Sequence, residues 1–298
     1  MGLADPGAVA GGPMTDLARV VFVHASKTGG STLRAVLRRL YRDAYRELGR
    51  DIAPALAELD AMPEARRERL RAVGGHAPYG VDRHLPGRWT TITLVRHPAE
   101  RILSHYSYVL RSPESPLHER VSAAGLGLRD YVTTFELASV INNGQTRLLG
   151  GDVDEPFRPT DGEHLERALA RLRNGDVLAG TTERFDTSLL LMARSLGWSA
   201  PWYVPAKVAP QRIQRDEIDG ETLRTILETN ALDVELHRAA AERLRLAVEA
   251  LGPRFPARLA RFLRLNGLRG RARDRAARVK AAAATLIGGG RRRRAGAR

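Results

Sequence analysis

One segment near the amino terminus constrains the fold of this chain more than any other. Residues 20–37 read VVFVHASKTGGSTLRAVL, so an apolar run is followed by a loop with two glycines and then by a helix-like sequence. This order predicts a buried strand, a tight turn and a helix start. The first backbone N–H groups of a helix attract anions, and glycines let an anion approach the main chain closely. The segment therefore predicts an anion-binding loop.

Lys27 lies in this loop and is one of only three lysines among 48 basic residues. Its ammonium adds a mobile positive charge, and Ser31 and Thr32 add hydroxyl donors. The lysine precedes the glycines, whereas in the Walker pattern GxxxxGK[ST] it follows them. The loop therefore favours a nucleotide anion over a magnesium-bound nucleoside triphosphate.

A second strand-to-helix junction follows at residues 90–108. The sequence TTITLV at 90–95 predicts a buried strand, and VRHPAERILSHYSY at 95–108 places Arg96 at its end. If a helix begins near Pro98, Ser104 falls within its second turn. A planar guanidinium and a hydroxyl are both suited to binding phosphate.

The remaining pattern alternates strands and helices. Besides the helices that follow the two junctions, helices are expected over residues 52–72, 162–173, 187–196, 220–228 and 231–250, and a short strand over 177–180. A loop is expected at 199–216. Such alternation predicts a three-layer α/β domain with a central parallel sheet flanked by helices. Ligands of such sheets bind at the carboxyl ends of the strands, where both junctions fall.

The net charge of +14 comes entirely from the end of the chain. Residues 254–298 contain 15 Lys and Arg against one acid, Asp274, whereas the first 253 residues have no net charge. We therefore expect a flexible segment at 1–16, one domain at 17–253 and a basic Arg/Ala-rich extension at 254–298. The extension has two open interpretations: loose binding to anionic membranes, polyanions or RNA, or a solvated tail whose arginines reflect codon usage.

Three absences narrow the class of protein. The chain has no cysteine, which excludes disulfides and thiolate zinc sites. It shows neither a secretory signal pattern nor an apolar stretch of about 20 residues. We expect a cytoplasmic protein, with peripheral membrane contact as the alternative. No aromatic residue occurs between 269 and 286, so specific nucleic-acid recognition is not expected.

Taken together, the two junctions resemble the nucleotide-binding motifs of sulfotransferases that use 3′-phosphoadenosine 5′-phosphosulfate (PAPS). KTGGST at 27–32 resembles their 5′-phosphosulfate loop, and RHPAERILSHY at 96–106 resembles their 3′-phosphate motif. Three further segments resemble the branch that contains heparan sulfate 2-O-sulfotransferase and bacterial relatives. These segments are GHAPYG at 75–80, NNGQTRLLGG at 142–151 and GTTERFDTSLLLMARSLGW at 180–198.

This resemblance implies a P-loop-like fold and in-line sulfuryl transfer from PAPS, leaving 3′-phosphoadenosine 5′-phosphate (PAP), to an acceptor hydroxyl on a saccharide or glycolipid. No metal is expected, because a sulfuryl group carries less charge than a phosphoryl group. The implied nucleotide-binding residues are Lys27, Thr28, Gly29, Gly30, Ser31, Thr32, Arg96 and Ser104.

The implied catalytic residues are Lys27, which stabilises the leaving phosphate, and His76, which matches the catalytic histidine of the 2-O-type enzymes. A histidine suits the task because a general base works best with a pKa near the working pH. Glu100 is the alternative base. Weaker candidates are Arg147, for acceptor or cofactor contact, and the pair Lys207 and Arg212, for closure over the nucleotide. His24 and His97 flank the two motifs and are expected to shape them.

The sequence leaves two other functions as alternatives. A P-loop-like kinase for a small metabolite would need a Walker lysine and an acidic magnesium ligand, and neither is evident. A polyanion- or RNA-binding protein would act through the basic extension and bind in a strongly salt-dependent manner.

Overall fold

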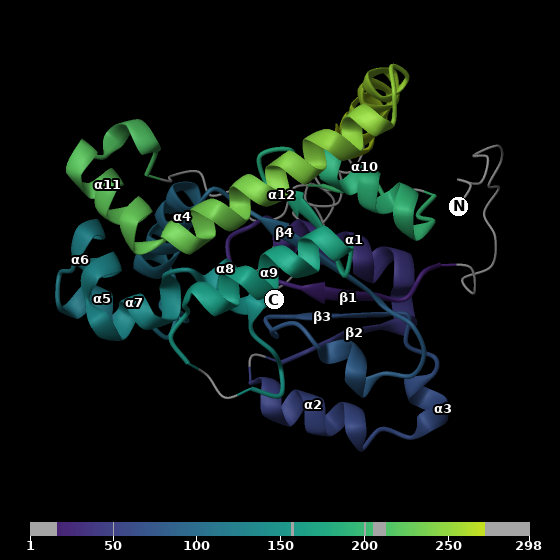
Figure 1. Cartoon of the computed structure of the whole chain (residues 1–298), viewed down its shortest axis with the longest axis horizontal. Coiled ribbons are helices and arrows are strands. Elements are labelled where there is room, and N and C mark those ends of the chain that lie inside the picture. The colour runs from purple at the N-terminus through teal and green to yellow at the C-terminus, as the bar shows by residue number, and fades with distance from the viewer. Residues whose placement is uncertain (1–16, 50, 156–157, 200, 205–212, 272–298) are drawn as a thin grey trace, which may run out of the picture.

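The computed structural model describes residues 17–271, apart from residues 50, 156–157, 200 and 205–212. Its centre is a five-stranded parallel sheet in the order β2-β3-β1-β4-β5, with helices around it (Figure 1). The strands are β1 (Val20–Val23), β2 (Tyr45–Glu47), β3 (Ala72–Gly75), β4 (Thr90–Val95) and β5 (Val177–Thr181). The predicted α/β architecture with a central parallel sheet is therefore confirmed.

Strands β1, β4 and β5 lie where the sequence predicted them, but β2 and β3 were not predicted. The expected helix over 52–72 ends early, and its last residue already belongs to β3. Strand β3 has the sequence AVGG, in which small residues give no strand pattern. It forms because β1 and β2 hold it on both sides, with Val23 paired to Gly75 in the parallel register.

The helices differ in how well the sequence predicted them. Those expected are α1 (Gly30–Tyr41), α2 (Ile52–Asp60), α4 (Pro98–Arg111), α9 (Gly162–Asn174), α10 (Phe185–Leu196), α11 (Gly220–Thr229) and α12 (Ala231–Ala250). Those not expected are α3 (Glu64–Arg67), α5 (His118–Ala123), α6 (Leu128–Thr133), α7 (Phe135–Ile141) and α8 (Gly144–Gly150). Within the described residues, short 3-10 turns lie at Arg42–Ala44, Val81–His84 and Arg215–Glu217.

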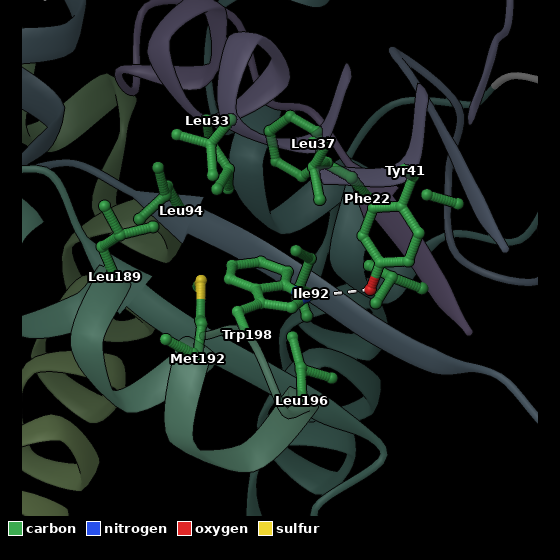
Figure 2. Packing of buried hydrophobic residues seen from close by; sticks show 14 residues of the cluster. Phe22, Leu33, Leu37, Tyr41, Ile92, Leu94, Leu189, Met192, Leu196 and Trp198 are labelled. Atoms are coloured by element: carbon green, nitrogen blue, oxygen red, sulfur yellow. Dashed lines mark hydrogen bonds between the residues drawn. The ribbon is translucent and has the colours of Figure 1, made fainter. Parts of the chain in front are cut away.

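The two faces of the sheet are covered by different helices, because alternate strand residues point to opposite sides. Phe22 and Leu94 contact α1 and α10 on one face, where Trp198 donates from its indole nitrogen to the Tyr41 hydroxyl at 2.9 Å (Figure 2). Val21 and Val23 face the other side, toward α2 and toward α8, α9 and α12. The result is a three-layer domain.

A second group of helices packs around its own apolar cluster. Helices α4, α5, α6, α7 and α11 share buried side chains that include Ile102, Val121, Tyr131 and Ile226. Because α4 begins directly after β4, this group is attached to the carboxyl edge of the sheet.

The strand order places a topological switch between β1 and β4. After β1 the chain moves through α1 to β2 at one edge and returns to β3, and it then passes β1 to form β4 and β5 on the other side. The loops that leave β1 and β4 therefore run in opposite directions. Sheets of this kind bind ligands at such a switch point, at the carboxyl edge.

The chain continues as a helix over residues 255–271 after α12. Phe262 of this helix packs against the cluster between α1 and α10, so the first part of the predicted extension contacts the domain. The predicted division at residue 253 stays a prediction, and segments 1–16 and 272–298 lie outside the described residues. Among the described helices, none is long and apolar enough to cross a membrane.

Candidate functional site

The loop after β1 holds Lys27 in an unusual backbone conformation. Lys27 has φ of 68°, in the left-handed region that non-glycine residues seldom adopt, and Gly29 has φ of 80° at the start of α1. The Thr28 hydroxyl closes the turn by donating to the Ala25 carbonyl at 2.8 Å. Strained residues held by their surroundings cluster at functional sites. The predicted loop is thus a fixed turn with Lys27 at its apex.

Gly30 is required by a close neighbour. A Cβ atom at this position would lie 2.0 Å from the His24 ring, so any larger residue would displace either the ring or the loop. Thr32 and Leu33 donate their amides to the Gly29 carbonyl at 3.0 and 3.3 Å. The amides of Gly30 and Ser31 precede these bonds and have no carbonyl within the helix to bind. They are the donors that an anion at this helix start would meet.

Arg96 connects the second junction to the first. Arg96 directly follows β4 and is only 8% exposed, and its Nη1 donates to the Lys27 carbonyl at 3.2 Å. Nη2 forms an ion pair with Glu100 at 3.1 Å. The guanidinium therefore lies against the lysine loop.

One face of α4 is turned toward the same loop. Glu100, Ser104 and Tyr108 are spaced four residues apart and therefore share a face of the helix. Glu100 at one end binds Arg96, and the ring of Tyr108 at the other end lies 4.3 Å from Lys27 Nζ. Ser104 lies between these two contacts. The structure thus brings Arg96 against the Lys27 loop and places Ser104 on the face of α4 that contacts both, while the role of these residues as a nucleotide site stays a prediction.

His76 joins this site because it directly follows β3, the strand beside β1. Its ring is exposed and stacks on His24 with 4.2 Å between ring centroids. Its Nδ1 lies 2.6 Å from the His24 carbonyl oxygen, which can only accept a hydrogen bond. The proton therefore resides on Nδ1 in the neutral tautomer, and the lone pair is on Nε2. This tautomer suits a general base.

Two other histidines near the site are unsuited to that role. Burial, together with the charges of His76, Arg34 and Lys27, lowers the pKa of His24 to about 3. Burial, together with the charges of Arg101, Lys27 and His76, lowers the pKa of His105 to about 3. Both stay neutral near pH 7 and are too weakly basic for efficient proton abstraction. The His24 ring lies against Gly30 of the loop and stacks on the His76 ring.

Gln145 is a residue of the site whose role the sequence did not reveal. Its Oε1 accepts from the Arg96 amide at 2.7 Å, and its Nε2 donates to the Arg96 carbonyl at 2.9 Å. The side chain is 1% exposed and lies on α8, in the segment NNGQTRLLGG. Gln145 therefore fixes the backbone of Arg96 from a helix remote in sequence.

Asp233 on α12 holds Gln145 in turn. This fully buried carboxylate accepts from Gln145 Nε2 at 3.1 Å and from the Thr146 amide at 2.8 Å, and it lies 3.4 Å from Arg101 Nη2. Buried charges persist in proteins when they are paired and hydrogen-bonded, as this one is. An aspartate in an amphipathic helix gives no hint of such a role in the sequence.

The carboxyl end of β5 closes the site from the far side. The Thr182 hydroxyl donates to the Thr28 carbonyl at 2.8 Å, which ties β5 to the lysine loop. Glu183 accepts from the His97 amide at 2.8 Å and from His237 Nε2 at 3.2 Å. Thr182 and Glu183 both belong to the segment GTTERFDTSLLLMARSLGW at 180–198.

The other residues that the sequence suggested for the site are Glu100, Arg147, Lys207 and Arg212. Glu100 is ion-paired with Arg96, which makes it less available as a base than His76. Arg147 donates to the Val140 carbonyl at 2.7 Å, and burial lowers the pKa of its guanidinium. Lys207 and Arg212 lie outside the described residues. Within the part of the chain that the structure describes, no group of three or more acidic or histidine side chains could hold a metal ion.

No curated protein matches this chain. Among solved structures, it is similar to the crystal structure of mouse sulfotransferase SULT7A1 complexed with PAP, at 19% identity and a TM-score of 0.36. That similarity covers 71% of this chain and 64% of that one, so the match spans less than two thirds of the mouse protein's chain. Residues 14–131, which contain the lysine loop, His76, Arg96 and Ser104, match the model of the Sulfotransferase family.

Proposed function

We propose that this protein is a sulfotransferase that moves a sulfuryl group from PAPS to an acceptor hydroxyl. The observation that carries the proposal is the convergence of two anion-binding junctions at the switch point between β1 and β4. Arg96 contacts the loop of Lys27 directly, at 3.2 Å from its carbonyl. The family match over residues 14–131 supports the same function, because it includes both junctions.

The residues present fit a nucleotide with phosphate groups at its 5′ and 3′ positions. The amides of Gly30 and Ser31 at the start of α1, with Lys27 beside them, would hold the 5′-phosphosulfate. Arg96 and Ser104 would hold the 3′-phosphate, since one offers a guanidinium and the other a hydroxyl on the inward face of α4.

In the proposed transfer, the acceptor oxygen forms a bond to sulfur while the bond between sulfur and the bridging phosphate oxygen breaks. His76 Nε2 takes the proton of the acceptor hydroxyl, because Nδ1 already donates to the His24 carbonyl. Lys27 Nζ and the loop amides stabilise the negative charge that develops on the leaving phosphate. The products are the sulfated acceptor and PAP, and no electrons are gained or lost.

We further propose that the acceptor hydroxyl belongs to a saccharide or glycolipid. The support is the resemblance of GHAPYG, NNGQTRLLGG and GTTERFDTSLLLMARSLGW to the 2-O-type branch. Tyr108 adds an aromatic surface beside Lys27, and aromatic rings pack well against the apolar faces of sugars.

Thermal unfolding with added nucleotides tests the function directly. A ligand at a hundred times its Kd stabilises the native state by about 2.7 kcal/mol, so PAP should raise the Tm and ATP with Mg²⁺ should not. Stabilisation by ATP and Mg²⁺ alone would identify the small-metabolite kinase instead. Transfer of label from ³⁵S-PAPS to cell-extract fractions would then identify the acceptor.

A further inference from the structure

The helix over residues 255–271 has one face fixed to the domain. Phe255, Phe262, Asn266 and Arg269 recur at helical spacing and share this face. Phe255 is 6% exposed, the Asn266 side-chain oxygen accepts from the Tyr203 amide at 2.8 Å, and Arg269 lies 5.6 Å from the Trp202 ring. These contacts hold the helix in place at the end of α12 (Figure 1, yellow).

The outward side of this helix combines positive charge with exposed leucines. Besides Arg269, which lies near the Trp202 ring, the helix exposes Arg258, Arg261, Arg264 and Arg271, and Arg254 is exposed just before it. Leu265 and Leu268 lie between them and are 44% and 55% exposed. About half of each of these two side chains is therefore open to solvent, which is unusual for leucine.

Codon usage does not account for this surface, because the neighbouring helix α12 has the same arginine-rich background and a balanced charge. Arg238 pairs with Glu235, and Arg245 pairs with Glu242 and Glu249. Between Glu249 and Asp274, by contrast, the sequence has no acid. Within the described residues, Arg254, Arg258, Arg261 and Arg264 form no ion pair.

We propose that the outward side of the 254–271 segment binds the surface of an anionic lipid bilayer. The arginines would contact lipid phosphates, and Leu265 and Leu268 would insert below the headgroups. Exposed leucines distinguish this partner from RNA or a soluble polyanion, which would use the charge alone. The nine further basic residues of 272–298 add charge at the same end of the chain.

Sedimentation of the full chain with vesicles tests the proposal. Wild-type protein should bind vesicles of three parts phosphatidylcholine to one part phosphatidylglycerol and should not bind pure phosphatidylcholine. The triple variant Arg258→Ala/Arg261→Ala/Arg264→Ala should bind roughly a hundredfold more weakly, from about fivefold per arginine. The double variant Leu265→Ser/Leu268→Ser should lose about tenfold. Arg238→Ala/Arg245→Ala on α12 is the matched control and should bind as wild type.

Three results would overturn this assignment. Equal binding of the triple variant and wild type would place any membrane affinity in residues 272–298. Unchanged vesicle binding by the leucine variant would show that charge alone drives the binding. If the wild type and the leucine variant both bind an RNA oligonucleotide or heparin more tightly than vesicles, the surface binds polyanions instead. Because all the substituted side chains are exposed, the variants should unfold at the wild-type Tm, which a thermal scan checks.

Discussion

Replacing Gln145 by alanine tests whether a remote helix positions the proposed 3′-phosphate arginine. The Gln145 carboxamide makes three hydrogen bonds: it accepts from the Arg96 amide, donates to the Arg96 carbonyl, and donates to Asp233. Alanine removes all three bonds but touches no atom of the proposed ligand. The two bonds to the Arg96 backbone are the direct link between Gln145 and the proposed site.

The structure sets the size of the effect. The substitution leaves a buried Arg96 amide without an acceptor and removes one donor from the buried Asp233 carboxylate. An unsatisfied buried group costs about 1–3 kcal/mol, so the free energy of unfolding should fall by about 2–4 kcal/mol in total. If Arg96 also loses its fixed orientation, a charged hydrogen bond of about 1.5–3 kcal/mol is weakened, and PAP affinity should fall roughly 10- to 100-fold.

The assay pairs isothermal titration with PAP and urea unfolding. Leu59→Ala is the matched control, because Leu59 is fully buried on α2 among residues that include Leu56 and Val73, away from the site. It should cost a similar 2–5 kcal/mol through a cavity. Its PAP affinity should equal that of wild type.

The result that refutes the reasoning is a Gln145→Ala protein that is less stable but binds PAP as wild type does. That outcome would make Gln145 a purely structural residue. A wild-type protein with no PAP affinity would instead refute the proposed function, so the two failures are distinguishable. Gln145→Glu provides a second check, since its carboxylate would face Asp233 and should be more destabilising than alanine.

The remaining predictions address the loop and its histidines. Lys27→Ala and Lys27→Gly should both abolish sulfuryl transfer. Because φ at this position is 68°, the Lys27→Gly variant should be more stable than Lys27→Ala by about 1 kcal/mol in urea unfolding. The opposite order would show that the backbone there is unstrained. His76→Ala should lower kcat by about 10²–10⁴ while PAP affinity is retained, and a parallel loss of both would contradict its role as base. Because burial depresses the pKa of His24 to about 3, the unfolded state binds a proton below pH 6.5 that the folded state does not. The free energy of unfolding should therefore be highest above pH 6.5 and should be lower by about 2 kcal/mol at pH 5. Urea midpoints measured at several pH values check this. An unchanged midpoint from pH 8 to 5 would argue that His24 is already accessible to solvent. Arg96→Ala should weaken PAP binding more than it lowers kcat, and the reverse split would assign Arg96 to the transfer step.

The sequence was informative where local patterns are strong. Two strand-to-helix junctions were identified from the run Val20–Val23 with the glycines after it and from the run TTITLV. In a parallel sheet the carboxyl ends of these two strands lie at the same edge, so the junctions were expected to meet there. The same reasoning failed for β3, because AVGG has no strand preference and is held by its neighbours on both sides. His76 was chosen by resemblance, whereas β3 explains physically why it lies beside the loop.

The sequence by itself determined the chemistry available to this protein: a rare lysine in a glycine loop, an arginine at a strand end, a serine within one helix of it, and a terminal extension with all the net charge. Only the tertiary structure decided how these groups are held. Gln145 and Asp233 are 49 and 137 residues away from Arg96 in the chain, and no local pattern links them to it. Their pairing arises because buried polar groups must find partners wherever packing places them. In the same way, contacts of one face of the last helix with Tyr203 and Trp202 decided which arginines and leucines turn outward.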